Sequence, residues 1–131
     1  MFQTKAAFSG FSVDDLAKAK QFYAETLGMK VDEEGEGMGI RLQLPGGGGT
    51  VFVYDKADHQ PASFTILNFV VDDIDRAVDE LGSRGVRFEH YDNGAKTDEK
   101  GVARGRAQNM GPDIAWFKDP AGNFLAVLQD S

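Results

Sequence analysis

This sequence of 131 residues contains few of the side chains that most often act as nucleophiles or bind transition metals, namely cysteine and histidine. There is no cysteine, which excludes disulfides, thiolate nucleophiles and thiolate metal sites. The two histidines, His59 and His90, are too far apart in the sequence to form a metal-binding motif. Two Asp-Asp pairs, at 14–15 and 72–73, each precede an apolar helical pattern, so we interpret them as helix caps rather than as an acid and a base. No pair of side chains has a catalytic spacing, so the sequence identifies no catalytic residue.

The charge of the chain argues against several kinds of partner. Its net charge is −7, from 21 acidic and 14 basic side chains, and such a surface repels the phosphates of nucleic acids. No apolar run approaches the roughly 20 residues of a membrane span, and the N-terminus lacks the apolar stretch of a secretory signal. We therefore expect a cytoplasmic protein with neither nucleic acid nor a membrane as partner. The charge serves solubility, although it would also suit a cationic ligand.

The sequence contains an internal repeat, which decides its organisation. Residues 13–19 (VDDLAKA) recur at 71–77 (VDDIDRA), an offset of 58 positions (71 − 13). Residues 28–31 (GMKV) match 85–88 (GVRF) at an offset of 57 (85 − 28). The chain is therefore predicted to consist of two copies of one module, each about half of its length.

Each copy is predicted to contain a strand, a helix and then further strands. The first helix has Asp14 as its N-cap, and Gly28 suits the left-handed conformation at its end. In the second copy Asp72 or Asp73 caps the helix. Alternation and β-branched residues predict strands at 5–12, 38–44, 50–54, 65–71, 114–117 and 123–128. Residues 91–112 have no clear period, which predicts a long loop of the kind that often forms a functional lid.

Three motifs carry a family resemblance. They are FSVDDLAKAKQFYAETLGMKV in the first copy, FVVDDIDRAVDELGSRGVRF in the second, and IAWFKDPAGNFLAVLQ at the end. With two βαβββ modules in one chain, the sequence resembles the glyoxalase/bleomycin-resistance/dioxygenase (vicinal oxygen chelate) superfamily over nearly its whole length. The resemblance implies an α+β fold, with one domain over 1–131 and modules at about 1–57 and about 62–131. Its two four-stranded sheets would curl into an open barrel around a cavity, with the helices outside.

The resemblance also implies where a metal would bind, because the enzymes of this family use a divalent cation. Their ligands lie on the first and the last strand of each module. At the matching positions this chain has Phe8 and Ile66 on the first strands and Ala126 on the last strand of the second module. The counterpart in the first module is Phe52 or Tyr54. None of these is a usual ligand of a divalent cation, so we expect neither a metal site nor a cofactor.

Alternation along the strands predicts which residues face the cavity. The candidate ligand-binding residues are Phe8, Arg41, Gln43, Phe52, Tyr54, Ile66, Asn68, Trp116 and Ala126. Arg41 and Gln43 are equally compatible with an outward, solvated face. Most of the set is aromatic or apolar with a few polar groups, which is typical of a small-molecule site. The alternative is that the aromatic side chains only fill a closed core.

We expect a metal-free binding protein, a homodimer, that holds a small aromatic or amphipathic molecule in the barrel cavity. Antibiotic sequestration is the task that the resemblance suggests. The alternative is a divergent enzyme of the lyase, isomerase or dioxygenase type. It would use relocated metal ligands or metal-free acid–base chemistry by Tyr54, Arg41, Glu89 or His90. A third hypothesis is an accessory module that binds no ligand.

Overall fold

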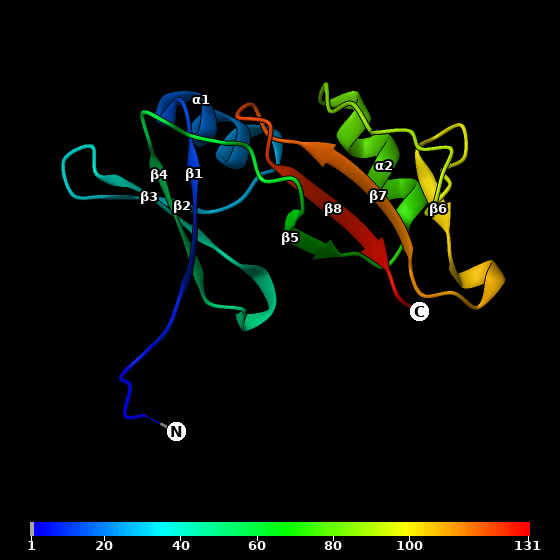
Figure 1. Cartoon of the computed structure of the whole chain (residues 1–131), viewed down its shortest axis with the longest axis horizontal. Helices are drawn as coiled ribbons and strands as arrows, with labels where there is room; N and C mark the ends of the chain where they lie inside the picture. The colour runs from blue at the N-terminus through cyan, green and yellow to red at the C-terminus, as the bar shows by residue number, and fades with distance from the viewer. Residues whose placement is uncertain (1) are drawn as a thin grey trace. The chain divides into compact units, whose positions relative to one another are not determined.

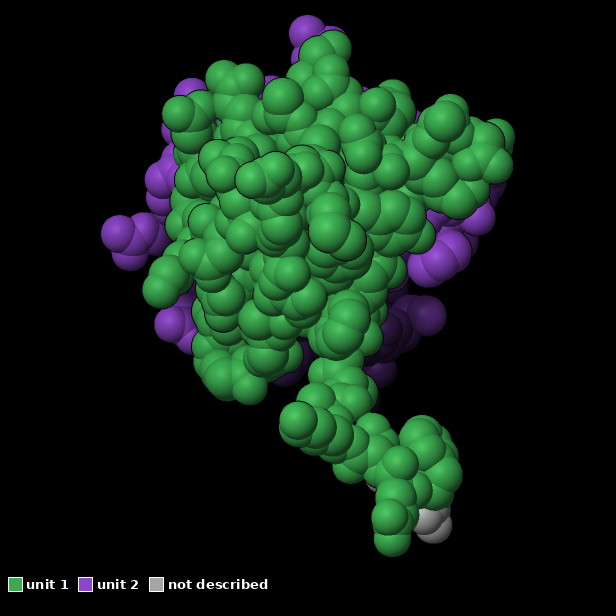
Figure 2. Space-filling model, turned by 90° about the vertical axis from the view of Figure 1, so that its left-hand side faces the viewer, with its two compact units in different colours: residues 1–61 green, residues 62–131 purple. Residues whose placement is uncertain are grey.

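The computed structural model describes residues 2–131 and divides the chain into two compact units, residues 1–61 and 62–131 (Figures 1 and 2). Each unit contains one four-stranded sheet and one α-helix. All strand pairs join strands of the same unit, so the strands form two separate curved sheets rather than one closed barrel. The predicted α+β class with two βαβββ modules is confirmed.

Unit 1 has the strand order β1-β4-β3-β2. Its elements are β1 (Ser9–Val13), α1 (Leu16–Gln21), a π-helical segment (Phe22–Thr26), β2 (Val31–Glu34), β3 (Gly39–Gln43), a 3₁₀ turn (Pro45–Gly47) and β4 (Thr50–Asp55). The first and last strands, β1 and β4, pair in parallel, and the other neighbours are antiparallel. Before β1 the chain extends away from the rest of unit 1 (Figure 2), and residues 2–10 are exposed.

Unit 2 repeats this plan with the order β5-β8-β7-β6. Its elements are β5 (Thr65–Val70), α2 (Ile74–Ser83), β6 (Val102–Arg104), a 3₁₀ turn (Arg106–Gln108), β7 (Asp113–Lys118) and β8 (Phe124–Gln129). Again the first and last strands of the unit pair in parallel. The identical strand order confirms the repeat that the sequence predicts.

The two helices begin at equivalent aspartates. The carboxylate of Asp15 accepts a hydrogen bond from the backbone N–H of Lys18, and that of Asp73 accepts one from Arg76, both at 3.1 Å. These bonds satisfy amides that have no partner within the helix. The prediction of Asp14 as the first cap was therefore wrong by one residue. Gly28 ends the first helical region with a φ of 71°, as predicted.

Each helix covers one face of its own sheet (Figure 1). In unit 1 the buried side chains of β3 and β4 include Ile40, Leu42, Val51 and Val53, and α1 packs against these two strands. In unit 2 the corresponding set on β7 and β8 is Ala115, Phe117, Leu125 and Val127, under Ile74 and Val78 of α2. Because side chains alternate along a strand, the residues between these point to the opposite face, which we call the open face of each sheet.

Two strands of the structure, β2 and β6, were not predicted from the sequence. The strand β2 reads Val-Asp-Glu-Glu, without the apolar alternation that marks a half-buried strand. The strand β6 has three residues and lies within 91–112, so that segment is not one continuous loop. No helix among the described residues has the length and apolar character needed to cross a membrane.

Candidate functional site

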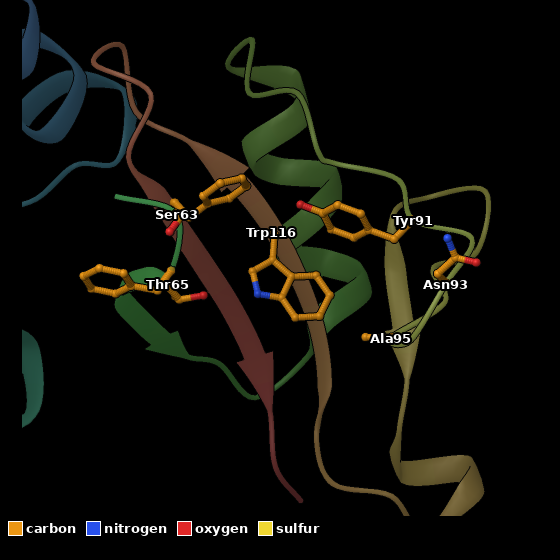
Figure 3. Close-up of a pocket in the computed structure, with 8 residues that line it drawn as sticks. Ser63, Thr65, Tyr91, Asn93, Ala95 and Trp116 are labelled. Atoms are coloured by element: carbon orange, nitrogen blue, oxygen red, sulfur yellow. The ribbon is translucent and has the colours of Figure 1, made fainter. Parts of the chain in front are cut away.

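The open face of unit 2 carries an aromatic hollow with a volume of about 220 Å³ (Figure 3). It is lined by Ser63, Phe64, Thr65, Tyr91, Asn93, Ala95, Trp116 and Phe124. Trp116, on β7, lies between Ser63 and Thr65 on one side and Tyr91, Asn93 and Ala95 on the other. The rings of Tyr91 and Trp116 meet edge to face, with their centroids 5.7 Å apart. The hollow therefore offers ring surfaces together with a few hydroxyl and amide groups.

A larger hollow of about 440 Å³ adjoins the first, since Trp116 and Ala95 line both. Its other lining residues are Gly94, Lys96, Ala103, Arg104, Gly105, Gln108, Met110, Pro112 and Ile114. Most of them come from the segment 94–112, so the region without a period in the sequence supplies most of this wall.

The 91–97 loop, which gives residues to both hollows, is closed by its own hydrogen bonds. The backbone N–H of Tyr91 donates to the Thr97 hydroxyl at 2.8 Å, and the N–H of Thr97 donates to the carbonyl of Tyr91 at 3.0 Å. Partial burial, and the nearby charge of Glu89, raise the pKa of the Tyr91 phenol. The phenol therefore stays protonated at neutral pH and remains a hydrogen-bond donor.

An ion-pair network connects the residues that follow this loop to α2. Arg104 donates to both carboxylate oxygens of Asp75, at 2.7 and 3.0 Å, and its Nε donates to Asp98 at 3.0 Å. Lys100 donates to Asp75 at 2.9 Å and also pairs with Asp79. The hydrogen bonds from Arg104, and then those from Lys100, hold the pKa of Asp75 well below its usual range. The network holds Asp98, Lys100 and Arg104, which follow the 91–97 loop, against Asp75 of α2.

The open face of unit 1 is organised around Arg41. Its guanidinium donates from Nε to Glu34 at 2.6 Å and from Nη1 to the Thr50 hydroxyl at 3.0 Å. The same guanidinium lies over the ring of Phe8 at 4.6 Å and near the ring of Phe52 at 5.5 Å. This cation is therefore already paired within its own unit.

Two further features complete that face. Gln43 donates to Asp32 at 2.8 Å, and the rings of Phe52 and Tyr54 stack with centroids 5.8 Å apart. Gly39 makes room for Phe52, because a Cβ at this position would lie 2.6 Å from a carbon of that ring.

The structure places the predicted site residues in two groups. In unit 1, Phe8, Arg41, Phe52 and Tyr54 lie together, and Gln43 shares their face. In unit 2, Asn68, Ala126 and Trp116 lie side by side across three strands. Trp116 lines both hollows, whereas Asn68 and Ala126 line neither. That these residues bind a ligand remains a prediction.

Ile66 departs from the expected alternation. The pairing of β5 with β8 shifts between Thr65 and Leu67, so Ile66 has no direct partner on β8. A bulge of this kind moves one residue out of the regular alternation. Thr65, opposite Phe124, lines the aromatic hollow in the place expected for Ile66.

Several lining residues were missed in the sequence, among them Phe64, Tyr91, Asn93 and Lys96. The lack of a period in the segment that begins at Tyr91 could have indicated these residues. The conformation of the loop, however, depends on contacts between residues that no local sequence pattern shows. Phe64 is 68% exposed, which is unusual for a ring of that size.

The residues considered for acid–base chemistry fall into two pairs, one in each unit. Tyr54 and Arg41 belong to unit 1, and Glu89 and His90 belong to unit 2. Glu89 faces Lys118 at 3.8 Å, and His90 is exposed. The other histidine, His59, is hydrogen-bonded through Nδ1 to the Ser12 hydroxyl at 2.6 Å.

The pairing register resolves which residue of unit 1 corresponds to Ala126. Asn68 pairs with Ala126, and Gly10, its equivalent at an offset of 58, pairs with Phe52. The four implied metal positions therefore hold Phe8, Phe52, Ile66 and Ala126, whose side chains have no ligating atom, so they do not fit a divalent cation. Among residues 2–131 there is no cluster of three or more side chains suited to holding a metal.

Comparisons with solved structures agree on the fold. The chain is 26% identical to TnmS3, an antibiotic binding protein from Streptomyces sp. CB03234, with a TM-score of 0.67 and coverage of 99% of this chain and 100% of that one. A putative glyoxalase family protein from Bacillus anthracis is 18% identical, with a TM-score of 0.65 and full coverage of both chains. A superfamily member from Sphaerobacter thermophilus DSM 20745 is 23% identical, with a TM-score of 0.65 and coverage of 96% and 98%.

A comparison with curated proteins found no match. The family model described as Glyoxalase/Bleomycin resistance protein/Dioxygenase superfamily matches residues 7–127. Together with the repeat and the two βαβββ modules, this match shows that the chain belongs to the glyoxalase/bleomycin resistance protein/dioxygenase superfamily.

Proposed function

We propose that the protein is a metal-free member of this superfamily that binds a small aromatic or amphipathic molecule in the aromatic hollow of unit 2. The observation that carries the proposal is the gathering of rings there. Tyr91, Trp116, Phe64 and Phe124 come from separate segments and line a single hollow. Converging ring surfaces with a few polar groups are typical of small-molecule sites.

The exposure of these rings supports a ligand rather than a filled core. Phe64 is 68% exposed and Tyr91 is 36% exposed. Covering apolar surface is worth roughly 25 cal/mol per Å², so a flat ligand on these rings gains affinity from area that the free protein leaves in water.

The polar groups at the rim would set the orientation of the ligand. Ser63, Thr65 and Asn93 line the hollow with Tyr91, whose hydroxyl can donate a hydrogen bond. An amphipathic ligand would place its ring against Trp116 and direct its polar end to these groups. A volume of about 220 Å³ suits one or two fused rings.

Two further observations support a binding protein rather than a metal enzyme. The implied metal positions carry Phe8, Phe52, Ile66 and Ala126, which offer no ligand for a divalent cation. TnmS3, which shares 26% identity over the full chain, is an antibiotic binding protein. Binding of a small molecule is the property that we extend from it to this chain.

The chain has a single tryptophan, which allows a direct test. In a ¹⁵N-labelled sample, Trp116 gives the one indole N–H signal, and a neutral planar probe, 2-naphthamide, is expected to shift it saturably. Calorimetry should then show that Trp116→Leu weakens binding of the probe by about 3- to 10-fold, since stacking with an aromatic ring is worth about 0.5–1.5 kcal/mol beyond the area covered.

The matched control is Phe8→Leu, which changes an exposed ring of unit 1. It should alter the dissociation constant by less than about twofold, because Phe8 does not line the hollow. If the indole signal does not move, or if both variants weaken the probe equally, the placement of the site in this hollow is wrong.

The metal-free part of the proposal has its own measurement. Purified protein loaded with Ni, Zn, Mn or Fe(II) and passed through gel filtration should retain less than about a tenth of an equivalent of metal. Stoichiometric retention of any of these ions would overturn it.

A further inference from the structure

The two hollows of unit 2 lie against each other, and they differ from the rest of the chain in charge. The chain carries 21 acidic side chains, yet no Asp or Glu lines either hollow. Two basic residues, Lys96 and Arg104, line the larger one. The charged side chains that line the hollows are therefore opposite in sign to the net charge of −7.

Of these two cations, Arg104 is already paired with carboxylates, whereas Lys96 is available to bind a ligand. The guanidinium of Arg104 is held by Asp75 and Asp98 in bonds of 2.7 to 3.0 Å. Lys96 forms no ion pair with any of residues 2–131. It is exposed in the 91–97 loop, next to Ala95, which with Trp116 forms the wall between the hollows.

The distance dependence of electrostatics decides which charge matters to a bound molecule. At physiological ionic strength the screening length is about 8 Å, so acidic groups farther than this from the ligand contribute little. Of the nearer ones, Asp75 and Asp98 are paired with Arg104, and Glu89 faces Lys118. A charge at hydrogen-bond distance from the Lys96 ammonium is screened far less. A negatively charged group would gain a charge-assisted hydrogen bond there, and a positive one would meet repulsion.

We infer that the ligand is a planar aromatic molecule carrying an anionic group, of the aromatic carboxylate class, with its ring on Trp116 and its charge at Lys96. This inference rests on the proposed function, because it assumes that the rings of the aromatic hollow bind the ligand. It excludes the cationic ligand that the net charge suggests. The larger hollow then accommodates the end of the molecule that bears the carboxylate.

Three naphthalene probes of similar size test the inference: 2-naphthoate, 2-naphthamide and (2-naphthyl)methylammonium. Calorimetry on the full chain at pH 7.5 and 0.1 M salt should show 2-naphthoate binding about 3- to 10-fold tighter than the neutral amide, with the cation weakest. In Lys96→Gln the preference for 2-naphthoate over 2-naphthamide should fall to less than about twofold, because the affinity for 2-naphthoate falls more than that for the amide.

The matched control is Arg76→Gln, which removes one positive charge from the exposed surface of α2, on the face of the sheet opposite to Trp116. It should keep the full preference for 2-naphthoate. The preference should also shrink as salt is raised, in the wild type but not in Lys96→Gln.

The outcomes separate the inference from the function on which it rests. If none of the three probes binds, the proposed function fails and the inference fails with it. If all three bind equally, if the cation binds best, or if Lys96→Gln keeps the preference, the function stands and the anionic ligand is wrong. A loss of preference in both Lys96→Gln and Arg76→Gln would show a general charge effect and would also overturn the assignment to Lys96.

Discussion

Equivalent rows of residues cross the open faces of the two sheets. They are Gly10, Phe52 and Arg41 in unit 1 and Asn68, Ala126 and Trp116 in unit 2. In unit 1 the large ring is on the last strand, and the neighbouring strand carries a cation that lies over it. In unit 2 the last strand has an alanine, and the ring is on the neighbouring strand.

The difference shows how a repeated backbone can separate two roles. On the open face of unit 1, Arg41 and Gln43 are bonded to neighbouring side chains. Arg41 donates to Glu34 and Thr50, and Gln43 donates to Asp32. In unit 2 the indole of Trp116 borders two hollows instead. We therefore expect substitutions in unit 1 to change stability, and substitutions on the open face of unit 2 to change binding.

The largest effect is expected when the alanine of unit 2 is replaced by the phenylalanine found at the equivalent position of unit 1. Ala126 has no exposed surface, so Ala126→Phe must displace its neighbour Trp116. Overpacking of this kind costs about 1–3 kcal/mol in the free energy of unfolding. We also expect the affinity for 2-naphthamide to fall by more than about tenfold, which calorimetry and urea denaturation would measure.

Phe52→Ala, the reverse change in unit 1, is the control. It should destabilise the protein but leave the affinity for 2-naphthamide within about twofold. Equal losses of affinity in the two variants would mean that the faces do not differ in the way we describe.

A smaller effect is expected from Arg41→Met. The side chain of Arg41 is only 21% exposed and holds Glu34, so its loss leaves a carboxylate without its partner. We expect urea denaturation to show a loss of about 1–2 kcal/mol in the free energy of unfolding, with unchanged affinity for 2-naphthamide. Lys20→Met, which breaks a more exposed pair with Glu33, should cost less. A clear loss of affinity in Arg41→Met would instead assign Arg41 to the ligand site, as the sequence predicts.

The smallest effect concerns the network behind the 91–97 loop, and it depends on pH. Asp75 is 48% exposed, so Asp75→Asn should cost only about 0.5–1 kcal/mol at pH 7. Because folding lowers the pKa of Asp75, its contribution is fully present above the ordinary value near 3.8 and is lost as the pH falls towards the folded value. The difference in unfolding free energy between wild type and variant should therefore be flat from pH 7 to about 5 and shrink below about 4.

Asp79→Asn is the matched control, since its carboxylate is 72% exposed and contacts Lys100 alone. It should show a smaller difference at every pH. A difference for Asp75→Asn that grew on acidification would contradict the lowered pKa.

The modules and most strands were predictable because their signals are local. The repeat at an offset of 58 gives the plan of both units, and the segments around β3, β4, β7 and β8 show regular alternation or bounded apolar runs. The acidic strand β2 and the three-residue strand β6 lack such a signal, since pairing with a neighbour, rather than their own composition, makes them strands.

The site was less predictable because it depends on contacts that are distant in the sequence. Trp116 was identified, but the bulge at Ile66 reverses the expected parity and puts Thr65 in the hollow. The position of Lys96 follows from the bonds between Tyr91 and Thr97 and from the pairing of Asp98 with Arg104. No periodic pattern marks these interactions.

The parallel pairing of the first and last strands in each unit has a consequence for synthesis on the ribosome. The sheet of unit 1 needs no strand beyond Asp55, so it can form while the second half of the chain is still being made. The strand β5, made at 65–70, must wait for β8 at 124–129 before its parallel partner exists. During that interval β5 is an unpaired edge, so unit 2 is exposed to aggregation through this strand until β8 has been made.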